Sequence, residues 1–270
     1  MRNRGASAGG LHCGEGLNTR PKNRVLDVYE RSLPSVPRDR PVSLMLRHAH
    51  RSAIPHGILG DDVELTDRGR SEAKELGDML QGFCLGTMAS NAIGRCIETA
   101  QMISIGHGDA STEVSIEMRL ANFGVFVRDR HLAEPQLLNL GAQEWVRRQL
   151  LEPSSLQGML ETSVGVDSLI DLLHPVGPPG LNLYVTHDVV VAALVGFLCG
   201  RGFHPNDWPS YLEGVFLWGG EEGFTIMWRD AQYTVDPSLS APRPDPEPKE
   251  SLPRTAVHRS RCDTHTIQEA

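Results

Sequence analysis

The stretch "VSLMLRHAHRSAIP", residues 42–55, decides how the rest of the chain is interpreted. Its first part is a short aliphatic run that predicts a buried strand over residues 42–46. Two histidines and two arginines follow directly, at residues 47–51. A buried strand has no room for unpaired cationic side chains, so this loop is expected to line a site at the end of the strand.

Outward from this strand, aliphatic runs alternate with helical patterns. Further strands are predicted at residues 85–90 and 181–186, with helices at residues 66–82, 94–104 and 188–200. A hairpin is predicted at residues 213–229, where two apolar runs surround "GGEEG". Alternating strands and helices indicate βαβ units. The sequence therefore predicts an α/β fold, a three-layer sandwich with a mostly parallel central sheet flanked by helices.

Composition divides the chain into three parts. Residues 1–38, rich in Gly, Arg, Asn and Pro, are expected to be largely disordered, with one or two helical turns allowed at "RVLDVYERSL", residues 24–33. Residues 39–235 are expected to form one α/β domain, in which residues 105–175 form a small cap of helices. Residues 236–270 are rich in Pro and charge and are expected to be a disordered tail.

Charge and hydropathy exclude several classes of partner. The formal net charge of −8 over 270 residues argues against a nucleic-acid binder. No apolar run approaches the roughly 20 residues that cross a bilayer. The five cysteines are scattered, and the N-terminus carries no apolar leader. We therefore expect a cytoplasmic protein with no membrane or nucleic-acid partner; the oligomeric state cannot be predicted.

Three polar segments follow the predicted strands, and the carboxyl ends of parallel strands meet at one edge of a sheet. The candidate site residues are Arg47, His48, Arg51, Arg95, His187 and Asp188. Several guanidinium groups form a pocket for a phosphate dianion. A neutral imidazole there can attack phosphorus, and a carboxylic acid can protonate the leaving oxygen. This chemistry requires no metal and no cofactor.

These segments resemble the histidine phosphatase superfamily, which has the phosphoglycerate-mutase-like fold. The resemblance rests on "LRHAHRSAIP", "LTDRGRSEAKELG", "SNAIGRCIETA" and "VTHD", which occur in the family's order across about residues 42–200. It implies that His48 is the nucleophile. It also implies that Arg47, Arg95 and His187 bind the transferring phosphoryl group and that Arg51 joins them.

The proton donor separates the two branches of this family. In the mutase-like branch a Glu stands where this chain has Leu120, in "MRLANFG". The acid-phosphatase-like branch uses the Asp of a His-Asp pair, which matches Asp188. The chain is therefore expected to lie closer to that branch, although Ala49 and Pro55 depart from its loop pattern. Glu117 and Glu134 are the alternative donors.

The sequence thus favours a metal-independent phosphatase that forms a phosphohistidine. Its expected substrate is a small phosphomonoester, such as a sugar phosphate or a biosynthetic intermediate. The alternatives are a phosphoglycerate-mutase-like phosphotransferase and a non-catalytic phosphate-binding module. His50 and His56 have no assigned role, and a zinc site of His48, His50 and His56 is weakly supported. Trp208, Tyr211 and Trp218 are expected to pack in the core.

Overall fold

The computed structural model describes residues 24–200, 207–220, 223–235 and 259–260. The strands span Pro41–Arg47 (β1), Leu85–Ser90 (β2), Val114–Ile116 (β3), Gly180–Thr186 (β4), Gly214–Gly220 (β5), Gly223–Trp228 (β6), Ala231–Val235 (β7) and Arg259–Ser260 (β8). The α-helices span Arg24–Ser32 (α1), Asp67–Met79 (α2), Gly94–His107 (α3), Arg130–Leu140 (α4), Ala142–Leu151 (α5), Thr162–Leu173 (α6) and Asp188–Cys199 (α7). Short 3-10 helices lie at Leu33–Ser35 (η1), Met118–Leu120 (η2) and Pro153–Ser155 (η3).

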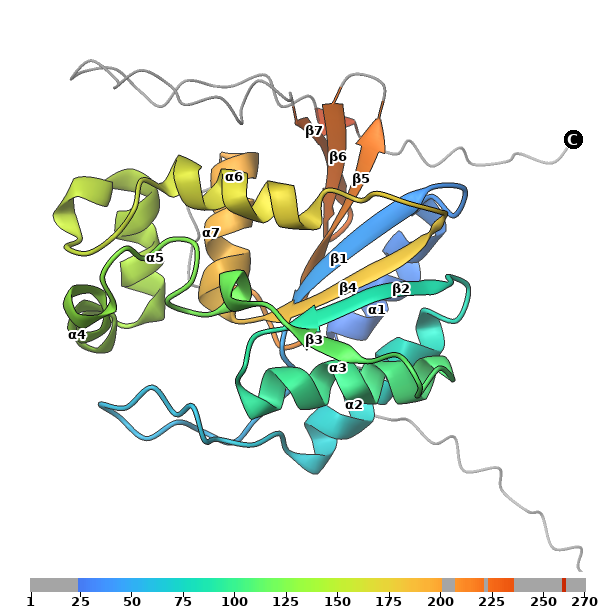
Figure 1. The fold of residues 1–270 in the computed structure, drawn as a ribbon, viewed down its shortest axis with the longest axis horizontal. Coiled ribbons are helices and arrows are strands. Elements are labelled where there is room, and N and C mark those ends of the chain that lie inside the picture. The colour runs from blue at the N-terminus through green and yellow to red at the C-terminus, as the bar shows by residue number, and fades with distance from the viewer. Residues whose placement is uncertain (1–23, 201–206, 221–222, 236–258, 261–270) are drawn as a thin grey trace, which may run out of the picture.

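Within these residues the strands form one eight-stranded sheet in the order β3-β2-β4-β1-β5-β6-β7-β8 (Figure 1). The β3-β2-β4-β1 half is parallel, as predicted. From β5 onward the neighbours are antiparallel, because a hairpin joins β5 to β6 and a second tight turn leads into β7. The α/β fold with flanking helices is confirmed, and its sheet is mixed, with β1 at the change of direction.

The sheet buries a different set of side chains on each face, because successive residues of a strand point to opposite faces. On β1, Val42, Leu44 and Leu46 belong to one hydrophobic cluster, whereas Met45 belongs to the other. Helices α2 and α3 cover the first face, and α6 and α7 lie on the second (Figure 1). The three layers predicted from the sequence are therefore present.

Helices α2 and α3 approach each other closely through glycine. A Cβ on Gly77 of α2 would lie 2.1 Å from the Ile103 carbonyl oxygen, and one on Gly106 of α3 would lie 2.0 Å from the Lys74 carbonyl oxygen. Thr66 is the N-cap of α2, and its side chain accepts a hydrogen bond from the Gly69 N–H group, as the sequence predicts. This pair of helices fixes Arg95, on the first turn of α3, against the sheet.

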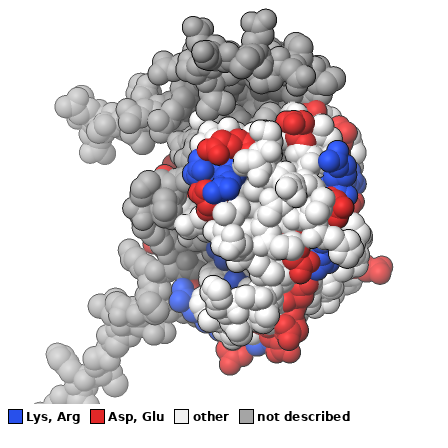
Figure 2. All heavy atoms as spheres, turned by 90° about the vertical axis from the view of Figure 1, so that its left-hand side faces the viewer, with Lys and Arg blue, Asp and Glu red and all other residues white. Residues whose placement is uncertain are grey.

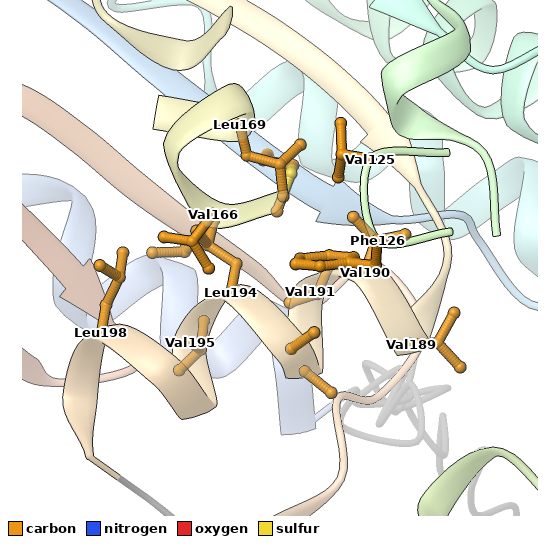
Figure 3. Close-up of a cluster of buried hydrophobic side chains, with 14 of the residues drawn as sticks. Val125, Phe126, Val166, Leu169, Val189, Val190, Val191, Leu194, Val195 and Leu198 are labelled. Atoms are coloured by element: carbon orange, nitrogen blue, oxygen red, sulfur yellow. The ribbon is translucent and has the colours of Figure 1, made fainter. Parts of the chain in front are cut away.

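Residues 118–173, which hold α4, α5 and α6, lie beside the sheet, and we call them the cap. The segment predicted to form a cap, residues 105–175, also holds the end of α3 and strand β3. Figure 3 shows that the cap is joined to the body by an apolar cluster, in which Val166 and Leu169 of α6 meet Val190 and Leu194 of α7. Phe126 lies in the same cluster, and a Cβ on Gly165 would come within 2.2 Å of its ring. The cap is therefore packed as part of the core.

On the outer face of the cap, the charged side chains lie mostly around the edge, and the centre of the face is largely uncharged (Figure 2). Its exposed apolar residues include Leu132 of α4, Leu151 of α5 and Val164 of α6. No helix in the described part of the chain is both long and apolar enough to cross a membrane.

Residues 24–36 differ from the expectation of disorder in the N-terminal segment. They form α1 and η1, and Val25, Leu26 and Tyr29 are buried against the sheet's first face. The sequence allows one or two helical turns in residues 24–33, and burial of these three side chains on one face stabilises the helix that forms there. Residues 1–23 lie outside the described residues, as does the predicted tail except β8.

Candidate functional site

The register of two central strands brings the two candidate histidines together. Arg47, the last residue of β1, pairs with Thr186, the last residue of β4. His48 and His187 therefore leave the sheet side by side, and the His48 N–H group donates to the Thr186 carbonyl at 2.9 Å. Their ring centroids lie 5.4 Å apart, at an interplanar angle of 75°. Both side chains are buried, at 2% exposure.

His48 has the protonation that nucleophilic attack requires. Its Nδ1 lies 2.8 Å from the Ala49 carbonyl oxygen, which can only accept, so Nδ1 carries the proton and Nε2 keeps its lone pair. Burial, followed by the nearby His187, lowers the pKa of His48 well below its usual value. The ring is therefore neutral at physiological pH.

Arg95 contacts the unprotonated ring nitrogen of His48. Its Nε donates to His48 Nε2 at 3.2 Å, and its Nη1 donates to the Gly60 carbonyl at 2.6 Å. The side chain is buried, at 3% exposure. Arg95 thus links the loop after β1 to the imidazole, and its guanidinium lies where a phosphoryl group on Nε2 would need positive charge.

Arg47 is held by three different contacts. Its Nη1 donates to the Pro209 carbonyl at 2.6 Å, and its Nη2 forms an ion pair with Asp188 Oδ2 at 3.0 Å. Its guanidinium carbon lies 4.2 Å from the ring centroid of Tyr211. These contacts fix the plane of the guanidinium beside His48.

Arg51 lies at the margin of the same cluster. Its Nη1 donates to the Ser52 carbonyl at 2.8 Å, while its Nε is buried without a hydrogen-bond partner. Burial first lowers the pKa of both His187 and Arg95, and the charge of Arg51 adds to that effect on each. Arg51 is thus close enough to act electrostatically on the site.

Asp188 is the first residue of α7 and faces the site. His187 is the N-cap residue, and Asp188 Oδ1 accepts from the Val189 N–H group at 3.0 Å. Its Oδ2 accepts from the Trp208 indole at 3.1 Å and pairs with Arg47. Burial raises the pKa of Asp188, but Arg47, the Trp208 hydrogen bond, His187 and the Val189 N–H group together outweigh burial, so the pKa lies below its usual value. Asp188 is therefore ionised in the free protein.

The two alternative proton donors are engaged by neighbouring arginines. Glu117 pairs with Arg119 at 2.7 Å, and Glu134 pairs with Arg130 at 2.8 Å. Leu120, which stands where the mutase-like branch has Glu, is fully buried in the core that the cap shares with the sheet. Among these positions, Asp188 alone is bonded to a candidate phosphate-binding arginine.

Several residues of the site are not apparent from the sequence. The Tyr211 ring packs against the rings of His48 and His50, at centroid distances of 5.8 Å and 5.0 Å. The Trp208 indole donates a hydrogen bond to Asp188. Trp218, in contrast, packs in the core as expected. Both aromatic side chains precede β5, an antiparallel strand whose start lies at the carboxyl end of β1. The hairpin pattern of the sequence does not show that β5 runs antiparallel to β1. With that direction known, the position of Trp208 and Tyr211 beside the site could have been predicted.

Asn91 and Cys96 complete the surroundings of His187. The Asn91 side-chain amide hydrogen-bonds to His187 Nε2, and Cys96 Sγ lies 3.8 Å from the same nitrogen. Burial raises the pKa of Cys96 to about 12, so it is a neutral thiol. Both residues follow β2, within the segment where the sequence analysis singled out Arg95 alone.

His50 and His56, the other two histidines of the loop after β1, do not lie beside His48 and His187 as candidate phosphate-binding groups. His50 Nδ1 lies 2.8 Å from the Thr66 hydroxyl oxygen, and His56 is exposed. Among the described residues no group of three or more His, Cys, Asp or Glu side chains is arranged to hold a metal ion. The zinc site considered from the sequence is thus not formed by His48, His50 and His56.

An α/β protein that gathers two neutral imidazoles and two arginines at its strand ends has the features of a phosphoryl-binding site. The sequence also matches the model of the histidine phosphatase superfamily (branch 1) over residues 44–211, more than half of the chain. The chain therefore belongs to the histidine phosphatase superfamily, as predicted. The matching model describes branch 1, and a closer relation to the acid-phosphatase-like branch remains a prediction.

Solved structures that are similar to this chain include three bacterial proteins. One is phosphoglycerate mutase from Bacillus anthracis str. Sterne, with 17% identity over 70% of this chain and 93% of that chain, at a TM-score of 0.44. Another is a mycobacterial glucosyl-3-phosphoglycerate phosphatase, with 19% identity over 70% and 98%, at a TM-score of 0.47. A third is a putative alpha-ribazole-5'-P phosphatase from Escherichia coli str. K-12, with 17% identity over 70% of this chain and 96% of that chain, at a TM-score of 0.46. No protein with a curated function matches the sequence significantly.

Proposed function

We propose that this protein is a metal-independent phosphatase that hydrolyses small phosphomonoesters through a phosphohistidine on His48. The observation that supports this best is the buried pair of neutral imidazoles, His48 and His187, with Arg95 donating to the nucleophilic nitrogen. A neutral nitrogen lone pair beside fixed positive charge is what attack on a phosphate dianion requires.

The first step transfers the phosphoryl group. The Nε2 lone pair of His48 forms the N–P bond as the P–O bond to the substrate breaks, and the electron pair of that bond leaves with the oxygen. The Arg95 hydrogen bond to Nε2 is exchanged for one to a phosphoryl oxygen. Arg47, Arg51 and His187 hold the other equatorial oxygens, so charge is stabilised throughout.

Asp188 is our proposed general acid. In the free protein Arg47 keeps it ionised. A bound phosphate competes with Asp188 for the Arg47 guanidinium and adds negative charge nearby, and both effects raise the pKa of the carboxyl group. Asp188 then takes up a proton, gives it to the leaving oxygen, and as a carboxylate accepts a proton from the water that cleaves the N–P bond.

Hydrolysis, and not return of the phosphoryl group to a second acceptor, is favoured by position 120. Position 120 is a leucine with a fully buried side chain, so this position supplies no carboxylate to the site. Analysis of products with phosphoglycerate tests the mutase-like alternative, because a transferase would give a phosphoglycerate isomer, whereas a phosphatase gives glycerate and phosphate.

The substrate class follows from the same chemistry. A site that binds the phosphoryl group alone suits a small phosphorylated metabolite, and we propose a sugar phosphate or a biosynthetic intermediate. We also propose a cytoplasmic location, because Cys84 and Cys96 are free thiols. A panel of phosphorylated metabolites assayed with the purified protein would identify the substrate.

The test of the mechanism is His48→Ala, with His56→Ala as the matched control. His56 lies in the same loop but is exposed, so its loss should leave turnover unchanged. We expect His48→Ala to lower phosphate release from an aryl phosphate by about 10³-fold or more. The wild-type protein should also carry an acid-labile phosphate during turnover. Unchanged turnover in His48→Ala would overturn the proposal, and phosphate binding with no turnover on any substrate would favour the binding module.

A further inference from the structure

We propose that Asn91 sets which nitrogen of His187 carries the proton, and is thereby a positioning residue of the phosphoryl site. The inference deepens the proposed function and rests on it. Asn91 follows β2 and is fully buried. Its backbone N–H group donates to the Val185 carbonyl at 3.4 Å, which places its side chain beside His187.

The neighbours of Asn91 determine which way its amide group points. The Ile93 N–H group donates to one end of the amide at 2.8 Å, so that end is the oxygen, Oδ1. The other end lies 3.4 Å from the Leu120 carbonyl oxygen, which can only accept, so that end is the nitrogen, Nδ2. Both neighbours are backbone groups with fixed polarity, so the assignment does not depend on the histidine.

The orientation of the amide fixes the tautomer of His187. Nδ2 can only donate, and it faces His187 Nε2, so Nε2 must accept and carries no proton. A neutral imidazole has one proton, which is therefore on Nδ1. Burial and the Arg95 charge keep the ring neutral, with the pKa of His187 lowered to about 3.

Within the described part of the chain, Nε2 also lies 3.8 Å from Cys96 Sγ. The Cys96 S–H group donates to the Thr186 carbonyl at 3.7 Å, so this contact does not require a proton on Nε2. The Cys96 side chain is a neutral thiol, so it does not act as a strong acceptor towards His187. Asn91 is thus the group that decides the tautomer.

The tautomer decides how His187 meets a phosphoryl group. Because Asn91 occupies Nε2, contact with the phosphoryl oxygens is left to Nδ1, which donates a hydrogen bond when it carries the proton. With the proton on Nε2 instead, Nδ1 would direct a lone pair at an anionic oxygen and would repel it. The role of Asn91 is therefore analogous to that of the aspartate that holds a catalytic histidine in the correct tautomer.

Asn91→Asp is the discriminating substitution. The carboxylate has the same shape and still accepts from Ile93, but it cannot donate to Nε2 and instead requires a proton there. Thr186→Val is the matched control, since the Thr186 hydroxyl also donates to the Leu120 carbonyl, at 2.6 Å, without bonding to a ring nitrogen. The control removes the second donor to the same carbonyl and leaves the Asn91 contact to His187.

The measurement is long-range ¹H–¹⁵N correlation on the full chain with ¹⁵N-labelled histidine, assigned by the loss of signal in His187→Gln. We expect the Nδ1–H tautomer in the wild-type protein and in Thr186→Val, and an Nε2–H or doubly protonated ring in Asn91→Asp. Turnover should fall about 10²-fold or more in Asn91→Asp, mainly in kcat, and stay within a few-fold of wild type in Thr186→Val.

The results separate the inference from the proposed function. An Nε2–H tautomer in the wild-type protein would overturn the inference even if Asn91→Asp failed to fold. An Nδ1–H tautomer that persisted in Asn91→Asp would overturn it too. If the tautomers behave as expected while His48→Ala keeps full turnover, the Asn91 contact stands and the proposed function fails.

Discussion

Asp188→Asn separates a general acid from a residue that only orients Arg47. The substitution keeps the shape of the side chain, and its amide oxygen can still accept from the Trp208 indole or the Val189 N–H group. It removes the proton that Asp188 would donate and the charge that pairs with Arg47 at 3.0 Å. The two losses affect different observables.

The loss of the charge should appear in stability. Removing one partner of a buried ion pair costs about 3–5 kcal/mol. The Arg47 and Asp188 side chains are 10% and 21% exposed, and Arg47 keeps its hydrogen bond to the Pro209 carbonyl and its contact with the Tyr211 ring. We therefore expect a lower cost, about 2 kcal/mol, which lowers Tm by roughly 4–8 °C for a domain of this size.

The loss of the proton should appear in the dependence on the leaving group. General acid catalysis contributes about 10²–10⁴-fold, or about 2.7–5.4 kcal/mol, when the leaving alkoxide needs a proton. An alkyl phosphate should lose that factor, whereas a nitrophenyl phosphate should lose less than about tenfold, since nitrophenolate leaves unprotonated. The assay is kcat/KM for both substrates in Asp188→Asn, with Glu117→Gln and Glu134→Gln as controls that should stay near wild type.

An equal loss on both substrates would refute the reasoning and leave Asp188 as the residue that orients Arg47. A selective loss on the alkyl phosphate in Glu117→Gln or Glu134→Gln would refute it in another way, by assigning the proton to the cap.

Two further predictions concern pH and metals. The pKa of His187 is about 3 in the folded protein and that of His48 is also lowered, against about 6.5 in the unfolded chain. Between those values the unfolded chain binds more protons, so the free energy of unfolding should fall as pH drops from about 6.5, by up to about 1.4 kcal/mol per pH unit for each histidine. Urea unfolding between pH 7.5 and 4.5 measures this slope, and a flat profile would contradict the buried neutral rings. Chelators should leave phosphatase turnover unchanged, and a strong loss that zinc restores would instead support a metal site.

Much of the fold could be predicted from the sequence because its signals are local. The aliphatic run of β1 and the apolar helix α7 can be identified from composition alone, and the Thr66 cap marks the start of α2. The juxtaposition of His48 and His187 followed from one rule, that parallel strands place their carboxyl ends at the same edge. The register of Arg47 with Thr186 shows why that rule brought them side by side.

The rest depends on contacts between distant parts of the chain, which no local pattern encodes. The ion pair of Asp188 with Arg47, which lowers the carboxyl pKa, forms between the first residue of α7 and the last residue of β1. Tyr211 and Trp208 reach the site only because β5 runs antiparallel to β1. Helix α1 belongs to the core through the few side chains of a single short face.

The change of direction at β1 has a consequence for the surroundings of the candidate site. Strand β1 lies between β4, which runs parallel to it, and β5, which runs antiparallel. The chain therefore leaves β1 and β4 at the edge of the sheet that holds His48 and His187, and it enters β5 at that same edge. The arriving segment, residues 207–212, supplies aromatic walls beside Arg47 and Asp188 without contributing a reacting atom. Because Tyr211 packs against Arg47 and Trp208 bonds to Asp188, an exchange of side chains in this segment would change the surroundings of two candidate site residues that lie on other elements.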